Sequence, residues 1–544
     1  MSKYYLVLLA AVILFCGCSK KSPSNGPITP GDIKSHIAAL ANDSLMGRKP
    51  FTEGENRAIR YISQQFKQIG LEPGNNGSYF QDVPMVEIKG TPSKTMEVTG
   101  KTSYSLQNST DFVAFTQQEQ EEVDLKNAPV VFAGYGVVAP EYHWNDYAGL
   151  DVKGKIVLVL VNDPGFKSGD PNFFKGDTMT YYGRWTYKFE EAARQGAAGV
   201  LVIHQTEAAS YPWSVVSSSN TGARLYLRQA NKHMDRCKME GWISDGATRK
   251  LLASAGITGD IRALARKRGF KAMPLGLNAS VSIHNQLKYS TSHNVIGLLK
   301  GSSNPGEYII YTAHWDHFGI GKPDAKGDSI YNGAVDNADG TASLISMAKA
   351  FADTKEKPKR SIIFLAVTGE EQGLLGSEYY ATHPIYPLNK TVANLNMDAL
   401  GNYGETKDIA ITGKGQNDLD DYIERYATEG GLTVVGDRKP WAGGYFRSDH
   451  FNFAKVGVPA LDMNNGDVSM KHDTAWAKKK QDDYTANHYH QPSDNYSPDM
   501  DATGMAQIAN LLYRLGYQLS NETTFPGWKA GSEFKAVREK SMGL

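Results

Sequence analysis

From residue 290 onward the chain alternates apolar runs with segments that carry apolar residues at helical spacing. The apolar runs include "HNVIGLLKG", "EYIIYTAHWDH", "RSIIFLAVTG", "TVANLNMDALG" and "VPALDM", and the helical segments include "TASLISMAKAFAD", "LDDYIERYATEGG" and "MAQIANLLYRLGYQL". Buried apolar strands that alternate with amphipathic helices are typical of an α/β sheet covered on both faces. The pattern therefore predicts a mixed β-sheet sandwiched by helices, with ligand sites at the carboxyl ends of the strands.

Several His and acidic residues follow these apolar runs directly or lie in neighbouring loops. They are His314, Asp316, Asp336, Glu370, Glu371, Asp398 and His490. A single acidic residue at a strand end is more often a helix cap or a solvated loop residue than a metal ligand. Their recurrence at successive strand ends favours a shared site, because the loops at one edge of a sheet bring such residues together.

The residue types in this set suit a pair of Zn²⁺ ions, which accept His nitrogen and carboxylate oxygen ligands and can share one carboxylate. Two metals about 3.5–4 Å apart can bind a carbonyl oxygen and lower the pKa of water toward about 7. The adjacent pair Glu370 and Glu371 then fits two roles, one as metal ligand and one as proton acceptor, with Gly369 and Gly373 allowing the turn. The alternative is a pair of exposed acids at a helix N-terminus, and the spacing alone leaves both interpretations open.

Six segments in this order resemble the motifs of metallopeptidase family 28, the co-catalytic zinc aminopeptidases. They are "TAHWDH", "GAVDNADGTASLISMAKAF", "FLAVTGEEQGLLGSEYY", "ANLNMDALG", "GGYFRSDHFNFAKVGVPAL" and "YHQPSD". The resemblance covers residues 290–520, and "LANDSLMGRKPFTEGENRAIRYISQQFKQIGLEP" shows a weaker similarity.

The resemblance implies two Zn²⁺ per chain and assigns a role to each residue of the set. The ligands of one metal are matched by His314, Asp336 and Asp398, and Asp336 also matches the carboxylate that bridges the two metals. The ligands of the other metal are matched by Glu371 and His490. Glu370 matches the general base, and Asp316 matches the acid that orients His314. Tyr445, three residues before "SDH", matches the tyrosine that stabilises the oxyanion, and Tyr489 is a rival by its resemblance to the carboxypeptidase branch.

The implied activity is the removal of the N-terminal residue from peptides with a free N-terminus. Carboxypeptidase or dipeptidase action on the same fold is the alternative, for which Arg447 is a candidate to hold a terminal carboxylate. Glutaminyl cyclisation and a non-catalytic receptor role are less favoured, because the full ligand set and the base are present. His317 matches no ligand position and is interpreted as a loop or pocket residue. The consecutive Ser448, Asp449 and His450 cannot form a nucleophilic triad, whose members converge from separate places.

The N-terminal run "YYLVLLAAVILFCGC" is too short for a typical membrane span and is interpreted as a signal peptide. It resembles a bacterial lipoprotein signal with Cys18 as the acylated residue, although Phe15 departs from the usual Leu. The alternative is an ordinary secretory signal. The predicted location is the bacterial cell envelope, outside the cytoplasm, with a lipid anchor to a membrane. Beyond the signal only Cys237 remains, so no internal disulfide is possible.

At 544 residues the chain exceeds what one hydrophobic core usually supports. The predicted organisation is a signal peptide (1–18), a tether (19–31), the N-terminal part of a peptidase domain (32–125), an inserted β-rich module (126–285), the zinc peptidase domain (286–520) and a C-terminal tail (521–544). The module resembles a protease-associated domain, whose implied role is a lid or a surface that restricts substrates. Lys and Arg total 58 and Asp and Glu total 58, so no net charge favours nucleic acid as a partner.

Overall fold

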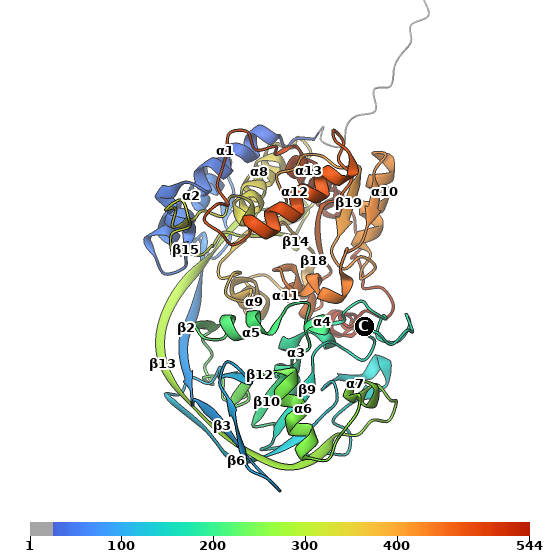
Figure 1. Ribbon diagram of the computed structural model, residues 1–544. Coiled ribbons are helices and arrows are strands. Elements are labelled where there is room, and N and C mark those ends of the chain that lie inside the picture. The colour runs from blue at the N-terminus through green and yellow to red at the C-terminus, as the bar shows by residue number, and fades with distance from the viewer. Residues whose placement is uncertain (1–25) are drawn as a thin grey trace, which may run out of the picture.

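The computed structural model describes residues 26–544, in which two groups of elements lie one above the other (Figure 1). The predicted signal peptide and its Cys18 lie outside the described residues. Within the described part of the chain, no helix combines the length and the apolar character needed to cross a membrane.

The upper group, here called the peptidase body, is built on a mixed sheet whose central strands are parallel. Strand β14 pairs in parallel with β17 on one side and with β18 on the other, and β18 continues in parallel to β21. The outer strands β13 and β19 are antiparallel to their neighbours β17 and β21. The strands are β1 (Glu72–Pro73), β13 (Met273–Leu299), β14 (Asn304–His314), β17 (Arg360–Val367), β18 (Thr391–Asn396), β19 (Asp408–Ile411), β20 (Thr433–Val435) and β21 (Ala460–Asn465).

Helices cover both faces of this sheet, as the alternating sequence predicts. Successive residues of β17 alternate between two cores: Phe364 packs with α1, α2, α8 and α13, whereas Leu365 packs with α9 and α11. Burial on both faces explains why β17 is apolar throughout its length after its first two residues. The helices are α1 (Pro30–Leu40), α2 (Glu53–Ile69), α8 (Asp339–Asp353), α9 (Leu375–Thr382), α10 (Leu419–Glu429), α11 (His450–Lys455), α12 (Thr474–Asn487), α13 (Thr503–Asn521) and α14 (Lys535–Met542). The predicted fold class is confirmed.

The lower group, here called the module, has its own cores, and its strands continue the sheet of the body through β13. Strands β6, β9, β10 and β12 are parallel neighbours, and α3 connects β9 to β10 as the predicted strand–helix–strand unit. The strands are β3 (Thr95–Thr99), β4 (Tyr104–Gln107), β5 (Phe112–Phe115), β6 (Glu122–Phe132), β9 (Ile156–Leu160), β10 (Gly199–Ile203), β11 (Arg224–Leu227) and β12 (Met239–Ile243). The helices are α3 (Trp185–Arg194), α4 (Thr206–Ala209), α5 (Trp213–Ser219), α6 (Asp245–Ser254) and α7 (Ile261–Ala265).

Strand β13 belongs to both groups. It is 27 residues long, and Figure 1 shows it running with β2 (Phe80–Pro92) along one side of the molecule from the body to the module. At its start it pairs with β6 of the module, and at its end it pairs with β17 of the body. Between these ends it pairs with β2 over 13 residues of each strand. The predicted boundary at 285/286 therefore falls inside a continuous strand.

Part of the segment 32–125 packs with the module. The sequence pattern assigns residues 32–125 to the peptidase domain, but Val98, Leu106 and Phe112 of β3, β4 and β5 pack in the core of the module. Strand β5 also pairs with β12 of the module. The cause is that alternating strands carry the same sequence pattern whichever sheet they join.

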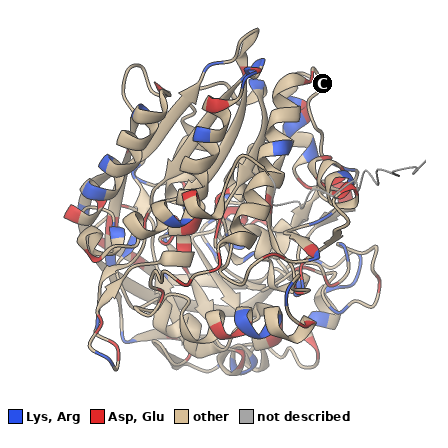
Figure 2. Ribbon diagram, turned by 90° about the horizontal axis from the view of Figure 1, so that it is seen from above, with Lys and Arg blue, Asp and Glu red and all other residues tan. Residues whose placement is uncertain are grey.

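Two further features complete the fold. The tail after residue 521, for which the sequence predicts no element, packs Trp528 and Phe534 into the core beneath α11 and ends in α14. Viewed from above, Lys and Arg residues are interspersed with Asp and Glu residues over the helices (Figure 2). This mixture is what the equal totals of 58 basic and 58 acidic residues lead one to expect.

Candidate metal centre

The ends of the central strands bring the candidate residues to one edge of the sheet. His314 is the last residue of β14, Glu370 and Glu371 follow β17, and Asp398 follows β18. Because β17, β14 and β18 are adjacent and parallel, their carboxyl ends lie side by side. Asp336 reaches the same edge from the irregular turn that precedes α8.

One half of the cluster is formed by His314, Asp336 and Asp398. The Nε2 atom of His314 lies 3.2 Å from Oδ1 of Asp336 and 3.3 Å from Oδ1 of Asp398. One potential ligand atom from each residue lies within 4.8 Å of the others. His314 is buried, with only 1% of its side chain exposed.

The other half is formed around the second oxygen of Asp336. Its Oδ2 lies 3.1 Å from Nε2 of His490, which is also 3.2 Å from Oε2 of Glu371. His490 stands at the rim, with 35% of its side chain exposed, whereas Glu371 is buried. Each oxygen of Asp336 thus faces a different histidine, which is the arrangement that a bridging carboxylate requires.

The donor set fits divalent metals because its atoms all offer electron pairs. The Nδ1 atom of His314 is 3.2 Å from the backbone carbonyl of Asp316, to which it donates a proton. In that tautomer the Nε2 atom has no proton, yet it faces two carboxylate oxygens and has no hydrogen-bond partner among residues 26–544. The Nε2 atom of His490 likewise faces two carboxylate oxygens and has no hydrogen-bond partner within the described chain. A cation between these groups would satisfy all of them, and imidazole with carboxylate is a zinc ligand set.

Glu370 lies beside the ligand cluster rather than within it. Its Oε2 atom is 3.9 Å from Nε2 of His314, farther than the oxygens of Asp336 and Asp398. Burial, and then the negative charges of Asp398 and other neighbouring carboxylates, raise the pKa of Glu370 well above its usual value. A raised pKa makes a carboxylate a better proton acceptor, which suits the predicted role of general base.

Glu370 and Glu371 take these different positions because the backbone turns between β17 and α9. Gly369 has φ 64° and Gly373 has φ 116°, in the region that favours glycine, as predicted. The backbone N–H of Glu370 donates to Oδ1 of Asp316 at 3.1 Å.

Asp316 therefore acts differently from the prediction that its carboxylate orients His314. Its Oδ1 atom lies 3.8 Å from Nδ1 of His314, beyond hydrogen-bond length, while its backbone carbonyl accepts from that nitrogen. The carboxylate instead fixes the turn that carries Glu370.

The structure does not bring Tyr445 into the cluster. Its hydroxyl is buried without a hydrogen-bond partner in the described part of the chain, its ring packs 4.7 Å from that of His450, and the charges nearest to it are Glu533, Asp420 and Asp462. Its predicted role at the oxyanion is thus not supported by this geometry. The reason is that the turn after residue 443 directs the ring into the core beneath α11.

The rival, Tyr489, lies at the cluster. Its ring stacks on that of His490 at 3.7 Å, and it lines the same cavity as Glu370. Desolvation, followed by the charges of Asp336 and Glu370, raises the pKa of its hydroxyl. This hydroxyl keeps its proton at neutral pH and is therefore a hydrogen-bond donor.

Three residues of the site receive no functional assignment from the sequence. Ser448 donates its hydroxyl to Oδ2 of Asp398 at 2.6 Å. Asp494, in the segment "YHQPSD", accepts from the backbone N–H groups of Val335 and Asp336. His317 hydrogen-bonds through Nδ1 to Oε1 of Glu371 and lies among the potential ligand atoms with Asp336. The sequence indicates His317 only as a loop or pocket residue and gives Ser448 no role, since spacing does not show which side chains converge.

A buried arginine from the N-terminal segment holds the loops of the centre. The guanidinium of Arg48 donates to the carbonyls of Trp315 at 2.8 Å, Leu40 at 2.7 Å, Asn332 at 2.5 Å and Gly333 at 3.1 Å. Trp315 lies between His314 and Asp316, and Asn332 and Gly333 precede Asp336. The weak resemblance around "LMGRKP" thus marks a residue that fixes two ligand loops at once.

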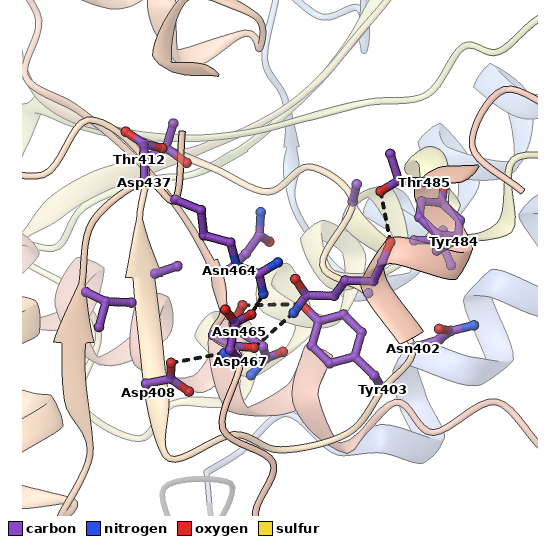
Figure 3. A pocket seen from close by; sticks show the side chains of 18 of the residues that line it. Asn402, Tyr403, Asp408, Thr412, Asp437, Asn464, Asn465, Asp467, Tyr484 and Thr485 are labelled. Carbon is purple, nitrogen blue, oxygen red and sulfur yellow. Dashed lines mark hydrogen bonds and ion pairs between the residues drawn. The ribbon is translucent and has the colours of Figure 1, made fainter. Parts of the chain in front are cut away.

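Two cavities meet at Tyr489. The larger, of about 560 Å³, lies between the module and the body and is lined by Glu370, Glu371 and His490 together with module residues such as Arg184. The smaller, of about 460 Å³, is lined by Ala399 next to Asp398. Figure 3 shows its polar lining, in which the side chains of Asn464, Asn465 and Asp467 lie between Asp408 and Tyr403.

Comparisons with known proteins identify two domains in the chain. Residues 294–515 match peptidase family M28, and residues 126–231 match the PA domain. Aminopeptidase NAALADL1 of Mus musculus is 36% identical over 132 residues, which cover 23% of this chain and 16% of that protein. A probable zinc metalloprotease of Pyrenophora teres f. teres (strain 0-1) is 40% identical over 109 residues, 20% of this chain and 22% of that protein. The matches thus span about a fifth or less of these relatives.

Among solved structures, an aminopeptidase from Aneurinibacillus sp. strain AM-1 matches with a TM-score of 0.48 at 20% identity, covering 92% of this chain and 96% of that one. The two domain matches, in the order PA domain and then peptidase, agree with the order inferred from the sequence motifs. The chain therefore carries a peptidase family M28 domain over residues 294–515, preceded by a PA domain over residues 126–231.

Proposed function

We propose that the chain is a zinc-dependent aminopeptidase that uses two Zn²⁺ ions to hydrolyse the N-terminal peptide bond of its substrates. The observation that carries this proposal is the position of Asp336, whose two oxygens lie 3.2 Å and 3.1 Å from the Nε2 atoms of His314 and His490. Asp398 completes the half of the cluster around His314, and Glu371 completes the half around His490. The family match and the name of the relative Aminopeptidase NAALADL1 support the same reaction.

In this proposal the residues of the chain divide the work between binding and proton transfer. When bound, the two zinc ions supply Lewis acidity that polarises the scissile carbonyl and makes water acidic. Glu370 accepts the proton of the attacking water on its carboxylate and then donates it to the nitrogen of the leaving amine. Tyr489 donates its hydroxyl proton in a hydrogen bond to the developing oxyanion. Asp316, through the backbone N–H of Glu370, holds the base in place.

In this proposal, selection of chain ends depends on the charges that line the larger cavity, which the module and the body both border. The carboxylates of Glu370 and Glu371, which line it, favour a positively charged α-amine. Tyr489 lines both the larger and the smaller cavity. In this proposal the N-terminal residue occupies one of these cavities and the rest of the peptide occupies the other.

Carboxypeptidase action is the second candidate, because one observation favours it. Arg447 lines the same cavity as Glu370 and is exposed there, where it could hold a terminal carboxylate. A Glutamate carboxypeptidase 2 homolog of Caenorhabditis elegans is 33% identical over 130 residues, 23% of this chain and 15% of that protein.

A metal measurement and a pair of peptides test the proposal. We expect zinc content near two per chain, release of the first amino acid from peptides with a free N-terminus, and no release from the N-acetylated forms. Release of the last residue from the acetylated peptides would select the carboxypeptidase instead. No bound metal and no hydrolysis of either form would refute both candidates.

We further propose that the protein is anchored by a lipid on Cys18 at the bacterial cell envelope. The support is the resemblance of "FCGC" to a lipoprotein signal. Metabolic labelling with a radioactive fatty acid should mark the wild-type protein and not a Cys18→Ser variant. Equal labelling of the two would contradict the anchor.

A further inference from the structure

The module has a cavity of its own, of about 400 Å³, which shares no lining residue with the two cavities at the metal centre. The segments that follow β9, β10 and β12 all contribute to its walls, and these strands are parallel neighbours. Their carboxyl ends therefore meet at this cavity, and this is the edge at which open α/β sheets bind ligands. Residues of α6 and α7 and the residue after α7 complete the lining.

The charges in this cavity do not balance. Its charged lining residues are Lys167, Arg249, Arg262, Arg266, Glu207 and Asp245. Both carboxylates already have basic partners, because Glu207 pairs with Lys167 and Asp245 pairs with Arg249. Arg262 and Arg266 bond only to uncharged groups within residues 26–544. The positive charges of these two arginines are therefore unopposed.

Arg262 is held in a fixed position in the cavity wall. Its guanidinium carbon is 5.8 Å from the ring centroid of Tyr135 and 5.9 Å from that of Phe166. The Nε atom donates to the side-chain carbonyl of Gln205, and Nη2 donates to the backbone carbonyl of Val161 at 3.3 Å. These neutral partners orient the guanidinium without neutralising it, so that little ordering remains to be done when a ligand binds.

Arg266 follows Arg262 by four residues and lines the same cavity. Its guanidinium makes one hydrogen bond within the described chain, from Nη2 to the backbone carbonyl of Phe166 at 2.9 Å, although it offers five donors. Burial lowers the pKa of Arg262, and the charge of Arg266 acts in the same direction. Arginine nevertheless stays protonated in proteins. Two neighbouring like charges in a partly desolvated wall are unfavourable unless an anion lies beside them.

We propose that this cavity binds a phosphate group through Arg262 and Arg266, as a ligand site of the module that is separate from peptide hydrolysis. A phosphate monoester carries a charge of about −1.5 to −2 at pH 7, which balances both arginines, whereas one carboxylate would balance only one of them. The guanidinium fork also fits phosphate oxygens with paired hydrogen bonds. A volume of about 400 Å³ lies in the range of small-ligand pockets, so that a small organic group on the phosphate also fits.

The phosphate group has two sources, which calorimetric titration of the zinc-loaded full chain separates. The probes are inorganic phosphate and glycerol phosphate, with acetate as the monoanion for comparison. We expect at least one phosphate compound to bind at least about tenfold more tightly than acetate, as the second charge requires. Tighter binding of glycerol phosphate would identify a monoester as the ligand, and equal or tighter binding of inorganic phosphate would identify the free ion. Binding of neither, or acetate binding as tightly as both, would overturn the proposal.

Substitution of the arginines places the bound phosphate in this cavity. Arg262→Met and Arg266→Met should each weaken phosphate binding by about 10- to 100-fold, the range for a charge-assisted hydrogen bond. Arg266→Lys keeps the charge but not the fork, and it should also weaken binding if the methionine variants fail to fold. Arg268→Met is the matched control, because Arg268 is exposed, follows Arg266 by two residues and does not line the cavity.

Hydrolysis of peptides by the same variants keeps the two sites apart. We expect kcat/KM to stay within about threefold of the wild-type value, since neither arginine lines a cavity at the metal centre. Phosphate binding that is unchanged in both Arg262→Met and Arg266→Met would come from the zinc ions or the larger cavity and would overturn the proposal. Loss of phosphate binding in these variants would support the site even in a protein that hydrolyses no peptide.

Discussion

Replacing Arg48 by methionine tests how the N-terminal segment supports the metal centre. The side chain is 1% exposed and donates to four backbone carbonyls, three of which belong to the loops that carry His314 and Asp336. Burial lowers its pKa to about 10, and the charges of Asp494 and Asp316 oppose this shift, so the guanidinium remains charged at pH 7. Methionine keeps much of the volume and removes every donor.

The magnitude follows from the contacts that are lost. A hydrogen bond from a charged donor contributes about 1.5–3 kcal/mol, which for four bonds gives an upper range of about 6–12 kcal/mol. The variant no longer has the desolvation cost of a buried guanidinium, and this gain in free energy offsets part of the hydrogen-bond energy that is lost. Broken networks around buried charges typically cost about 3–5 kcal/mol, and we expect the free energy of unfolding to fall by this amount. Zinc should also bind about 10- to 100-fold more weakly, because the residues around its ligands lose their support.

Urea denaturation followed by tryptophan fluorescence measures the first quantity, and competition with a zinc chelator measures the second. Arg57→Met is the control, since Arg57 is exposed and its ion pair with Glu53, at 3.0 Å, should contribute less than about 1 kcal/mol. If the two variants lost the same stability and bound zinc equally well, Arg48 would not be the support that its contacts indicate.

Three further predictions concern the residues of the centre. Glu370→Gln should keep both zinc ions and lower kcat by about 10²–10⁴-fold, whereas Glu371→Gln should lose one zinc. Metal analysis that found the same loss in both variants would contradict the assignment of Glu370 as base and Glu371 as ligand. His317→Ala should weaken zinc binding by about 10- to 100-fold, because its contact with Glu371 is removed, and unchanged affinity in a chelator titration would refute this. Tyr489→Phe should lower kcat by about 10²–10³-fold, because it removes one hydrogen-bond donor to the oxyanion, whereas Tyr445→Phe should leave kcat nearly unchanged. Steady-state kinetics showing the reverse would return the oxyanion role to Tyr445.

The presence of the strands and the residues at their ends were predictable from the sequence. Buried parallel strands appear as apolar runs, and the polar residue that follows each run lies at the carboxyl edge of the sheet. This is why His314, Glu370, Glu371 and Asp398 lie together in the structure as their positions in the sequence indicate.

Other parts of the site were not predictable, because they depend on contacts with the backbone or on the direction of a side chain. Asp494 and Arg48 bind main-chain groups of distant loops, and no spacing of residues reveals such partners. The backbone directs Tyr445 onto His450 in the core and Tyr489 onto His490 at the cluster, and the sequence does not show this difference. The packing of β3, β4 and β5 with the module was not predictable for a related reason, since the sequence of a short strand does not show which neighbouring strands it joins.

The unbroken course of β13 sets the mechanical character of the enzyme. Rotation of the module about the body would have to break the ladder that this strand forms with β2 over 13 residues, or bend a backbone that has no loop to absorb the motion. A change in the width of the cavity between the module and the body would therefore require the ribbon formed by β13 and β2 to bend or twist along its length, because no loop in this ribbon is available as a hinge.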